Sequence, residues 1–341
     1  MTASNITQLV RKNILALQPY ISFRDHHQFN TPVLMDANES PFGECNRYPD
    51  STHQKLRDQL AQTKNISSKQ IAAGNGSDEL IDLLIKIFCE PKKDSILVMD
   101  HSFTMYSFYA SINENDVTKV PLDENFDIQK NEFLKISKEK KPKIFFLCSP
   151  NNPTGNSISD IEFYIEHFDG IVVIDEAYIE FSDKKSSIEL LGKYPNLIIL
   201  QTFSKAWGMA GARVGVAYAS EQIIRLIYTV KAPYNVSSLN QELILKQLRD
   251  LDSFHEHLEG ILTEKKWLKN EFHDIKCIKK VFPTDSNFFL IEFYDAENVY
   301  EKLLKNEILT SKKFPQIPGC IRINVGNRSE NIILITILKS I

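Results

Sequence analysis

Residues 171–178 read IVVIDEAY, an apolar run that ends in an aspartate and is followed three residues later by a tyrosine. The run does not alternate apolar and polar residues, which is typical of a strand covered on both faces in a parallel sheet. Similar runs lie on either side of it, namely SILVM (95–99), KIFFLC (143–148) and NLIIL (196–200). Most spacers between these runs are long enough for a crossover helix. The middle of the chain is therefore predicted to be an α/β domain with a mainly parallel sheet covered by helices.

The two ends of the chain have a different pattern. The N-terminal residues form an amphipathic segment, whereas beyond about Val236 mixed-charge helical patterns are followed by the alternating strands SNFFLIEF and GCIRINVG. Alternation favours strands with one face on a core and the other toward solvent. The sequence thus predicts three parts: an arm, 1–30; a large domain, 31–235, whose residues 31–45 could pack with the small domain; and a small α+β domain, 236–341.

Composition limits the classes of partner. The 341 residues carry a formal net charge of -4, which gives no indication of nucleic acid or an anionic membrane as a partner. The N-terminus lacks the pattern of a signal peptide, and no run approaches the roughly 18 apolar residues of a membrane span. The five cysteines are scattered without a C-x-x-C pair, so reduced thiols and a cytoplasmic location are expected. No metal is expected, because His255 and His257 lie two apart and do not share a helix face.

Polar side chains follow three of the predicted strands. Asn152 lies in SPNNPTG, Asp175 and Tyr178 end IVVIDEAY, and Ser204 and Lys205 follow NLIIL. In open α/β sheets ligands bind outside the carboxyl ends of the strands, so these groups should meet on one rim. A carboxylate, a phenol, a carboxamide and a lysine suit a heteroaromatic cofactor that has a ring nitrogen, a ring hydroxyl and an aldehyde. Pyridoxal 5'-phosphate fits this description.

Each ring substituent has a candidate partner. Lys205 would form a Schiff base with the aldehyde, and Asp175 would keep the ring nitrogen protonated, which makes the ring an electron sink. Asn152 and Tyr178 would hydrogen-bond the ring hydroxyl. Phe103, in HSFTMY after the 95–99 strand, would stack on the ring face.

The cofactor phosphate needs donors, and a glycine-rich turn provides them. AAGNGSDELIDLLIKIF (72–88) places such a turn before an amphipathic helix, with Ser77 as the expected N-cap. Helix N-termini bind phosphate through free N–H groups and the helix dipole. The side chain of Asp78 is expected to point away while its amide faces the ligand, and Ser204 and Arg213 would complete the phosphate site.

Each motif also has an ordinary structural explanation. GNGS lacks the Gly-Lys-Ser/Thr of a P-loop and the third glycine of a dinucleotide site. Asp175 could cap a helix, Lys205 could be a solvated loop residue, and Arg213 could be a surface charge. What favours pyridoxal phosphate is the order of four motifs along the chain: the glycine turn before a helix, NNPTG, DEAY and SKAWGMAGAR.

SPNNPTG, IDEAYIEF and TFSKAWGMAGARVG resemble the pyridoxal-phosphate enzymes of the aspartate-aminotransferase fold. Over nearly the whole chain, LMDANESPFG, NRYPD, KAPYNVSSLNQ and GCIRINVG are similar to histidinol-phosphate aminotransferases. The resemblance implies transfer of an amino group from histidinol phosphate to 2-oxoglutarate in histidine biosynthesis, giving imidazole-acetol phosphate and glutamate. It also implies a homodimer whose active sites lie at the subunit interface.

The resemblance assigns four more residues. Tyr48 of NRYPD would reach the partner's cofactor phosphate, whereas Tyr20 of the arm and Asn38 of LMDANESPFG would approach the substrate. Arg322 of GCIRINVG would meet the carboxylate of glutamate or the phosphate of histidinol phosphate. From the strand pattern alone, Arg322 is a surface residue.

The chain departs from the family pattern in one stretch, EILTSKKF. Thr310 stands where many members have a second arginine, and Lys312 and Lys313 follow it. A lysine can replace that arginine as a point charge, although it lacks the bidentate fork. His101 stands where a proline is usual.

Three other functions remain open. A threonine-phosphate decarboxylase, or another aminotransferase of aromatic or phosphorylated amines, would have a similar sequence. A binding or regulatory module that kept the fold and lost turnover is a further alternative, against which the intact Lys205 argues.

Overall fold

A seven-stranded sheet lies at the centre of the larger part of the molecule. The computed structural model describes residues 3–20, 22, 24 and 33–341. The strand order is β1-β7-β6-β5-β4-β2-β3. The four predicted strands are present and mutually parallel: β2 (Ser95–Met99), β4 (Ile144–Cys148), β5 (Ile171–Asp175) and β6 (Leu197–Thr202). Every residue of β4, β5 and β6 is buried, as expected from runs without alternation.

Three further strands complete the sheet and were not predicted: β1 (Ile71–Gly74), β3 (Asp116–Val120) and β7 (Gly215–Ala219). β3 is parallel to β2, whereas β7 is antiparallel to both β6 and β1. Because β7 lies between β1 and β6 and is antiparallel to both, β1 and β6 run in the same direction. Gly74 and Thr202 both pair with Gly215, so the carboxyl ends of β1 and β6 lie on the same rim.

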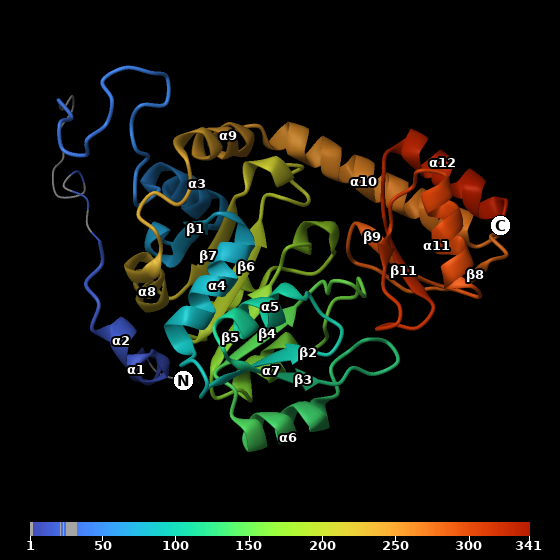
Figure 1. The fold of residues 1–341 in the computed structure, drawn as a ribbon, viewed down its shortest axis with the longest axis horizontal. Helices are drawn as coiled ribbons and strands as arrows, with labels where there is room; N and C mark the ends of the chain where they lie inside the picture. Colours follow the sequence, from blue (N-terminus) through green and yellow to red (C-terminus); the bar gives the residue numbers. More distant parts are fainter. Residues whose placement is uncertain (1–2, 21, 23, 25–32) are drawn as a thin grey trace.

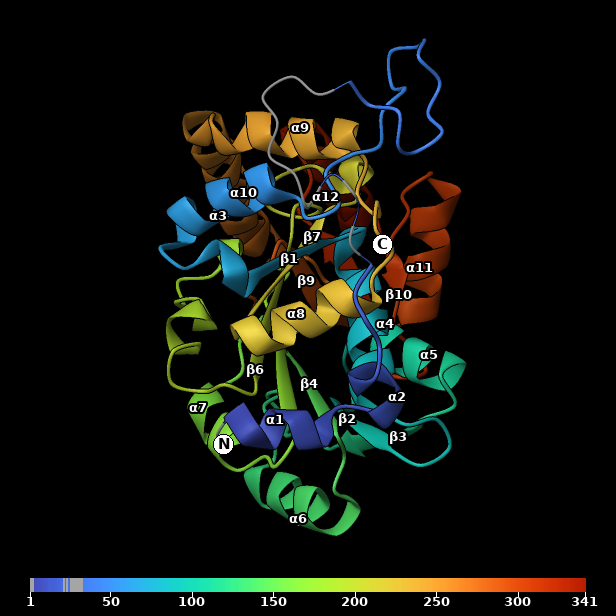
Figure 2. The ribbon, with the colours of Figure 1, turned by 90° about the vertical axis from the view of Figure 1, so that its left-hand side faces the viewer.

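Helices cover the sheet and bury their apolar sides on it. α4 (Gly76–Phe88) and α8 (Glu221–Val230) pack near β1 and β7, and α5 (Met105–Ile112) packs on β2 and β3 (Figures 1 and 2). The remaining helical segments of this part are α1 (Ala3–Leu9), α2 (Lys12–Leu15), α3 (Gln54–Lys64), α6 (Lys130–Lys140), α7 (Ile161–Glu166), α9 (Ser238–Leu248) and the 3₁₀ turns η2 (Ser68–Gln70), η3 (Ile179–Phe181), η4 (Ser187–Leu190) and η5 (Ala210–Ala212).

The smaller part has a four-stranded antiparallel sheet in the order β10-β11-β9-β8. Its elements are β8 (Ile278–Val281), β9 (Phe288–Phe293), β10 (Ser311–Lys312), β11 (Cys320–Asn324), α11 (Ala296–Lys305) and α12 (Arg328–Lys339). Phe289, Ile291 and Ile321 share a separate apolar core with both helices. In register, Arg322 lies between Leu290 of β9 and Ser311 of β10.

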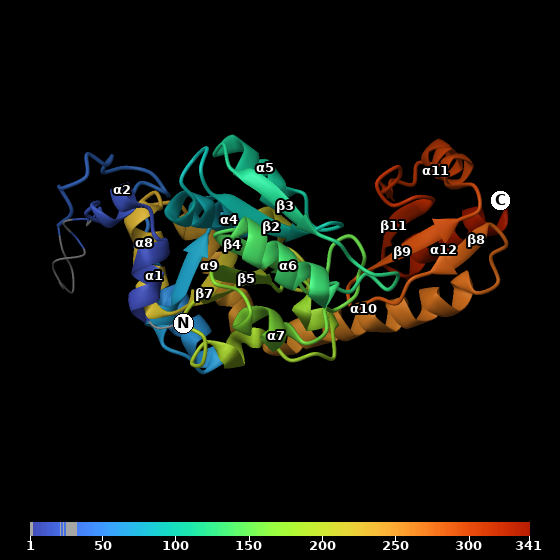
Figure 3. The ribbon, with the colours of Figure 1, turned by 90° about the horizontal axis from the view of Figure 1, so that it is seen from below.

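The long helix α10 (Leu251–Phe272) joins the two parts (Figures 1 and 3). Its first turn packs on the large part, where Phe254 stacks on Trp207 at 3.9 Å between ring centroids. Its last turns belong to the core of the small part through Leu268 and Phe272. α9 packs on α3 and buries Leu248 in the large core. Packing therefore places the transition within α10, later in the chain than the predicted boundary at residues 235 and 236.

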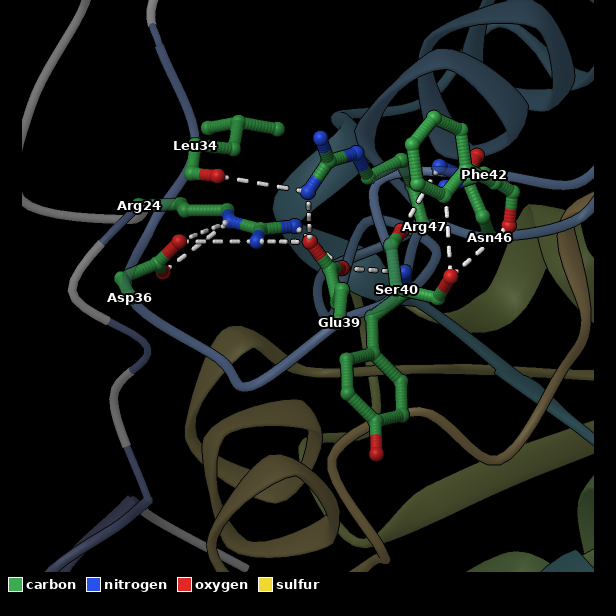
Figure 4. A network of polar contacts seen from close by, with 9 residues as sticks. Arg24, Leu34, Asp36, Glu39, Ser40, Phe42, Asn46 and Arg47 are labelled. Carbon is green, nitrogen blue, oxygen red and sulfur yellow. Dashed lines mark hydrogen bonds and ion pairs between the residues drawn. The ribbon is translucent and has the colours of Figure 1, made fainter.

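The segment from residue 33 to residue 48 projects from the end of the molecule opposite the small part (Figures 1 and 3). The expected packing of residues 31–45 against the small domain does not occur among the described residues. Arg24 holds this segment through Asp36 at 2.8 Å and Glu39 at 2.7 Å, and Arg47 pairs with Glu39 at 2.8 Å (Figure 4). Part of the predicted arm, 1–2, 21, 23 and 25–30, lies outside the described residues.

Within the described ranges, no helix has both the length and the apolar character needed to cross a bilayer. Nor does that part of the chain bring together three His, Cys, Asp or Glu side chains that could hold a metal ion. The five cysteines are all free thiols, and only Cys45 is exposed.

Candidate active site

A cavity of about 150 Å³ lies at the carboxyl ends of β4, β5 and β6, beside the N-terminus of α4. We call it the small cavity. Its wall includes Cys148, Asp175 and Thr202, which end the three strands. All the predicted cofactor residues except Tyr48 line it: Ser77, Asp78, Phe103, Asn152, Asp175, Tyr178, Ser204, Lys205 and Arg213. They come from distant segments of the sequence and meet because β1, β4, β5 and β6 run in the same direction.

Asp175 is a buried carboxylate at the end of β5. The Tyr106 hydroxyl donates to Oδ2 at 2.6 Å, and the Ala177 amide donates to Oδ1 at 3.0 Å. Burial raises the pKa of Asp175 to about 6, although both hydrogen bonds and the charge of Lys205 act in the opposite direction. The next helical turn, η3, begins at Ile179 and has Tyr178 at its N-cap position, so Asp175 does not cap it. A carboxylate in this setting is suited to hold a cationic ring nitrogen. The positive charge of that nitrogen would lower the pKa of the carboxylate and keep it fully ionised.

Lys205 lies in the turn after β6. Its Nζ is 5.6 Å from the centroid of the Tyr178 ring. No carboxylate of the described residues lies within 4 Å of this amine, so it is not held in an ion pair. Burial of the amine, and then the charge of Arg322, lower the pKa of Lys205. A lower pKa increases the fraction of neutral amine, which is the nucleophilic and basic form.

Tyr178 and Asn152 face the same space. Tyr178 packs edge-on against Phe288 at 5.3 Å, and its burial raises the pKa of the phenol, which therefore stays protonated and can donate. Asn152 accepts a hydrogen bond from Arg322 through Oδ1. The neighbouring Asn151 is fully buried and instead ties its loop to the carbonyl of His101 at 2.7 Å.

The N-terminus of α4 is open to the small cavity. Ser77 is not the N-cap as predicted: the helix begins at Gly76, and Asn75 is the capping residue. Gly76 has φ +79°, and a Cβ there would lie 2.7 Å from Arg213 Nη2. A Cβ on Gly215 would lie 2.3 Å from the Ser77 amide nitrogen. Both positions thus need glycine so that Arg213 and the α4 amides can close around the cavity.

The expectation for the side chain of Asp78 is wrong. Its Oδ2 lies 3.3 Å from Arg213 Nη2, so the carboxylate faces the cavity and does not point away from it. The physical reason is the attraction between this carboxylate and the Arg213 guanidinium, which form an ion pair. Ser204 completes the group, with its Oγ 3.5 Å from Arg213 Nη1 and its amide donating to Thr202 Oγ1 at 3.1 Å.

A second cavity of about 770 Å³ adjoins the first. We call it the large cavity, and it shares Phe103, Asn152, Tyr178 and Lys205 with the small one. Arg322 lines it and does not lie free on the surface, since its guanidinium is 5.1 Å from the centre of the Phe288 ring. Burial lowers the pKa of Arg322. The remaining lining residues include Asp100, His101, Lys119, Lys312, Lys313 and Gln316.

Three predicted residues line neither cavity. Tyr48 stacks on Tyr234 at 4.5 Å, and Tyr20 packs edge-on against the same ring at 6.4 Å. Asn38 is exposed, with φ +55°. Thr310, the position where an arginine was expected, also lies outside both cavities, and its buried Oγ1 has no hydrogen-bond partner among the described residues.

Two residues of the site were missed. Tyr106 is fully buried, stacks on Phe146 at 4.8 Å and reaches Asp175. Phe103 precedes α5 and packs edge-on against Tyr106 at 5.5 Å between ring centroids, a contact that the sequence HSFTMY did not reveal. Thr202, the last residue of β6, carried no signal beyond its place directly before the Ser204 turn.

Comparisons with known proteins agree with this geometry. The chain matches the family model of class I and II aminotransferases over residues 22–338. A histidinol-phosphate aminotransferase of Cytophaga hutchinsonii is 41% identical, over 99% of each chain. One from Bacteroides thetaiotaomicron is 41% identical, over 98% of each. The crystal structure of the histidinol-phosphate aminotransferase from Clostridium acetobutylicum superposes with a TM-score of 0.79 at 25% identity, covering 87% of this chain and 90% of that one. The chain belongs to the class I and II aminotransferase family.

Proposed function

We propose that this aminotransferase uses pyridoxal 5'-phosphate to transfer the amino group of L-histidinol phosphate to 2-oxoglutarate. The products would be imidazole-acetol phosphate and L-glutamate, in histidine biosynthesis in the cytoplasm. The observation that carries the proposal is the small cavity, where Lys205 and the buried Asp175 face one space beside the cationic large cavity. The names of full-length relatives at about 41% identity support the choice of substrate.

The residues around the small cavity fit the cofactor. Glycine at 76 and 215 lets the Arg213 guanidinium and the α4 amides approach closely beside the cavity, where a Cβ would meet Arg213 Nη2 or the Ser77 amide nitrogen. The near-neutral pKa of Asp175 suits a cationic partner. The groups would be held as follows: the ring nitrogen by Asp175, the ring hydroxyl by Asn152 and Tyr178, the ring face by Phe103, and the phosphate by the α4 amides at Ser77 and Asp78 with Ser204 and Arg213.

Pyridoxal phosphate, when bound, supplies an electron sink for the charge that develops at the substrate α-carbon. Lys205 Nζ would remove the α-proton of the amino donor and, in the second half of the cycle, return a proton to the α-carbon of glutamate. Asp175 would hold positive charge on the ring side, with Tyr106 fixing the direction of its carboxylate. Arg322 would bind the anionic end of each substrate.

The proposal includes a homodimer. The segment at residues 33–48 exposes Val33, Met35 and Phe42 by 87%, 90% and 83%, which is unusual for large apolar side chains of a monomer. The ion pairs of Glu39 with Arg24 and Arg47 stiffen this segment. In a dimer, Tyr48 would reach the partner's cofactor phosphate, and Tyr20 and Asn38 would approach a substrate.

A product assay separates this function from the decarboxylase alternative. Cofactor-loaded protein incubated with histidinol phosphate and 2-oxoglutarate should release glutamate in amounts equal to the imidazole-acetol phosphate formed. Carbon dioxide from threonine phosphate, without glutamate from histidinol phosphate, would contradict the proposal. No change in cofactor absorbance with either amine would instead support a binding module.

A further inference from the structure

The wall of the large cavity carries more positive than negative charge. Two of its lysines already have partners. Lys119 pairs with Asp100 at 3.1 Å. Lys312 lies 3.9 Å from Glu297 and 4.2 Å from the centre of the Phe314 ring. These two cations are therefore at least partly satisfied within the protein.

Lys313 and Arg322 are different. Among the residues that the structure describes, no carboxylate lies within 4 Å of either cation. Arg322 donates through Nη1 to the neutral carboxamide of Asn152, which contributes no charge. Both cations line the large cavity, and burial, followed by the charge of Arg322, lowers the pKa of Lys313.

Backbone pairing explains why they are close. Arg322 is opposite Ser311 in the β10–β11 ladder, and the Lys313 amide donates to the carbonyl of Cys320 at 3.1 Å. Lys313 therefore directly follows β10 and lies beside Cys320, two residues before Arg322 in β11. The side chains of Lys313 and Arg322 both line the large cavity. Two half-buried like charges without a counter-ion cost free energy, and a charge of opposite sign bound between them would offset this cost.

We infer that Lys313 binds the phosphate of the amino donor together with Arg322 and determines the preference for a phosphorylated amine. The inference rests on the proposed function. A phosphate monoester carries about -1.5 to -2 charge at pH 7 and three acceptor oxygens. The planar fork of Arg322 can take two oxygens, and the compact ammonium of Lys313 can take a third from another direction. The single negative charge of a side-chain carboxylate, as in 2-oxoglutarate, needs only Arg322.

The test compares two lysines in one chain. Lys313→Met should raise the KM for histidinol phosphate by about ten- to a hundredfold, the range expected from losing a charge-assisted hydrogen bond. It should leave kcat and the KM for 2-oxoglutarate within about threefold. Lys312→Met, the matched control, should stay within about threefold for both substrates, and Lys313→Arg should restore most of the affinity.

Two further probes make the result specific. Histidinol, the same amine without phosphate, should react equally well with the wild type and Lys313→Met. Inorganic phosphate should compete with histidinol phosphate more weakly in Lys313→Met than in the wild type. Circular dichroism and cofactor absorbance check that the variant folds, and Lys313→Gln replaces it if it does not.

An unchanged KM for histidinol phosphate in Lys313→Met, or an equal loss with histidinol, would overturn the inference while leaving the proposed function intact. A wild-type protein that does not convert histidinol phosphate would instead remove the proposed function, and the inference with it.

Discussion

At the residue scale, the proposed chemistry depends on a carboxylate that the fold keeps near its point of ionisation. Asp175 is buried, and its pKa of about 6 reflects burial opposed by hydrogen bonds from Tyr106 and Ala177. Without these donors the pKa would be higher, and the neutral acid could not hold a cationic ring nitrogen. Tyr106 is thus a positioning residue that acts through Asp175.

Replacing Tyr106 with phenylalanine tests this role. The variant keeps the ring that stacks on Phe146 but loses the donor, so the pKa of Asp175 should rise further. In the wild type, pyridoxal phosphate affinity should fall as pH drops below about 6, where Asp175 takes up a proton. In Tyr106→Phe this fall should begin at higher pH, and affinity at pH 7 should be about tenfold lower. Fluorescence titration from pH 5 to 8 measures both, and identical profiles would refute the role.

At the element scale, the site forms where the carboxyl ends of several parallel strands meet at one edge of the sheet. The apolar runs of β2, β4, β5 and β6 could be predicted because strands buried on both faces leave an unbroken pattern. β1 has only the four residues IAAG and left no such signal, although it carries the turn that leads into α4. Likewise, nothing in the periodicity of α5 indicates that the Tyr106 hydroxyl meets a residue 69 positions away.

At the rim of the sheet, the backbone of β7 at Gly215 lies close to the backbone of α4 at Gly76 and Ser77. Gly215→Ala should destabilise the protein by about 1–3 kcal/mol, since its Cβ would meet the backbone of Ser77 and Gly76. It should also weaken cofactor binding by displacing the α4 amides. Gly260→Ala, exposed in the interior of α10 with no atom within 4 Å of its Cβ, should stabilise by about 0.5–1 kcal/mol. Denaturant unfolding of the cofactor-free proteins measures both, and equal shifts would contradict the steric explanation.

At the scale of the whole molecule, one chain does not bring Tyr48 to the small cavity, and Tyr48 stacks instead on Tyr234. Both parts contribute to the wall of the large cavity, the large part through Lys205 and the small part through Arg322. The helix α10 connects the two parts, because it packs on the core of each. The sequence pattern puts the boundary between the parts at residues 235 and 236, whereas α9, which follows that point, packs on α3 and the large core.

If two copies share each active site, inactive chains should complement one another. Tyr48→Ala and Lys205→Ala, each inactive or strongly impaired alone, should form mixed dimers with one intact site after denaturation and refolding together. About a quarter of wild-type activity is expected from equal amounts, because half the dimers are mixed and each has one working site. No gain over the separately refolded variants would contradict a shared site.

We propose above all that the amine of Lys205 forms a Schiff base with the cofactor aldehyde, with Asp175 at the ring nitrogen. Borohydride reduction of the cofactor-loaded protein, followed by digestion and mass spectrometry, tests it directly. We predict that the reduced pyridoxyl group will be found on the peptide containing Lys205, and that Lys205→Ala, folded by circular dichroism, will carry none and will not turn over. Label on another lysine, or a fully active Lys205→Ala, would contradict the account.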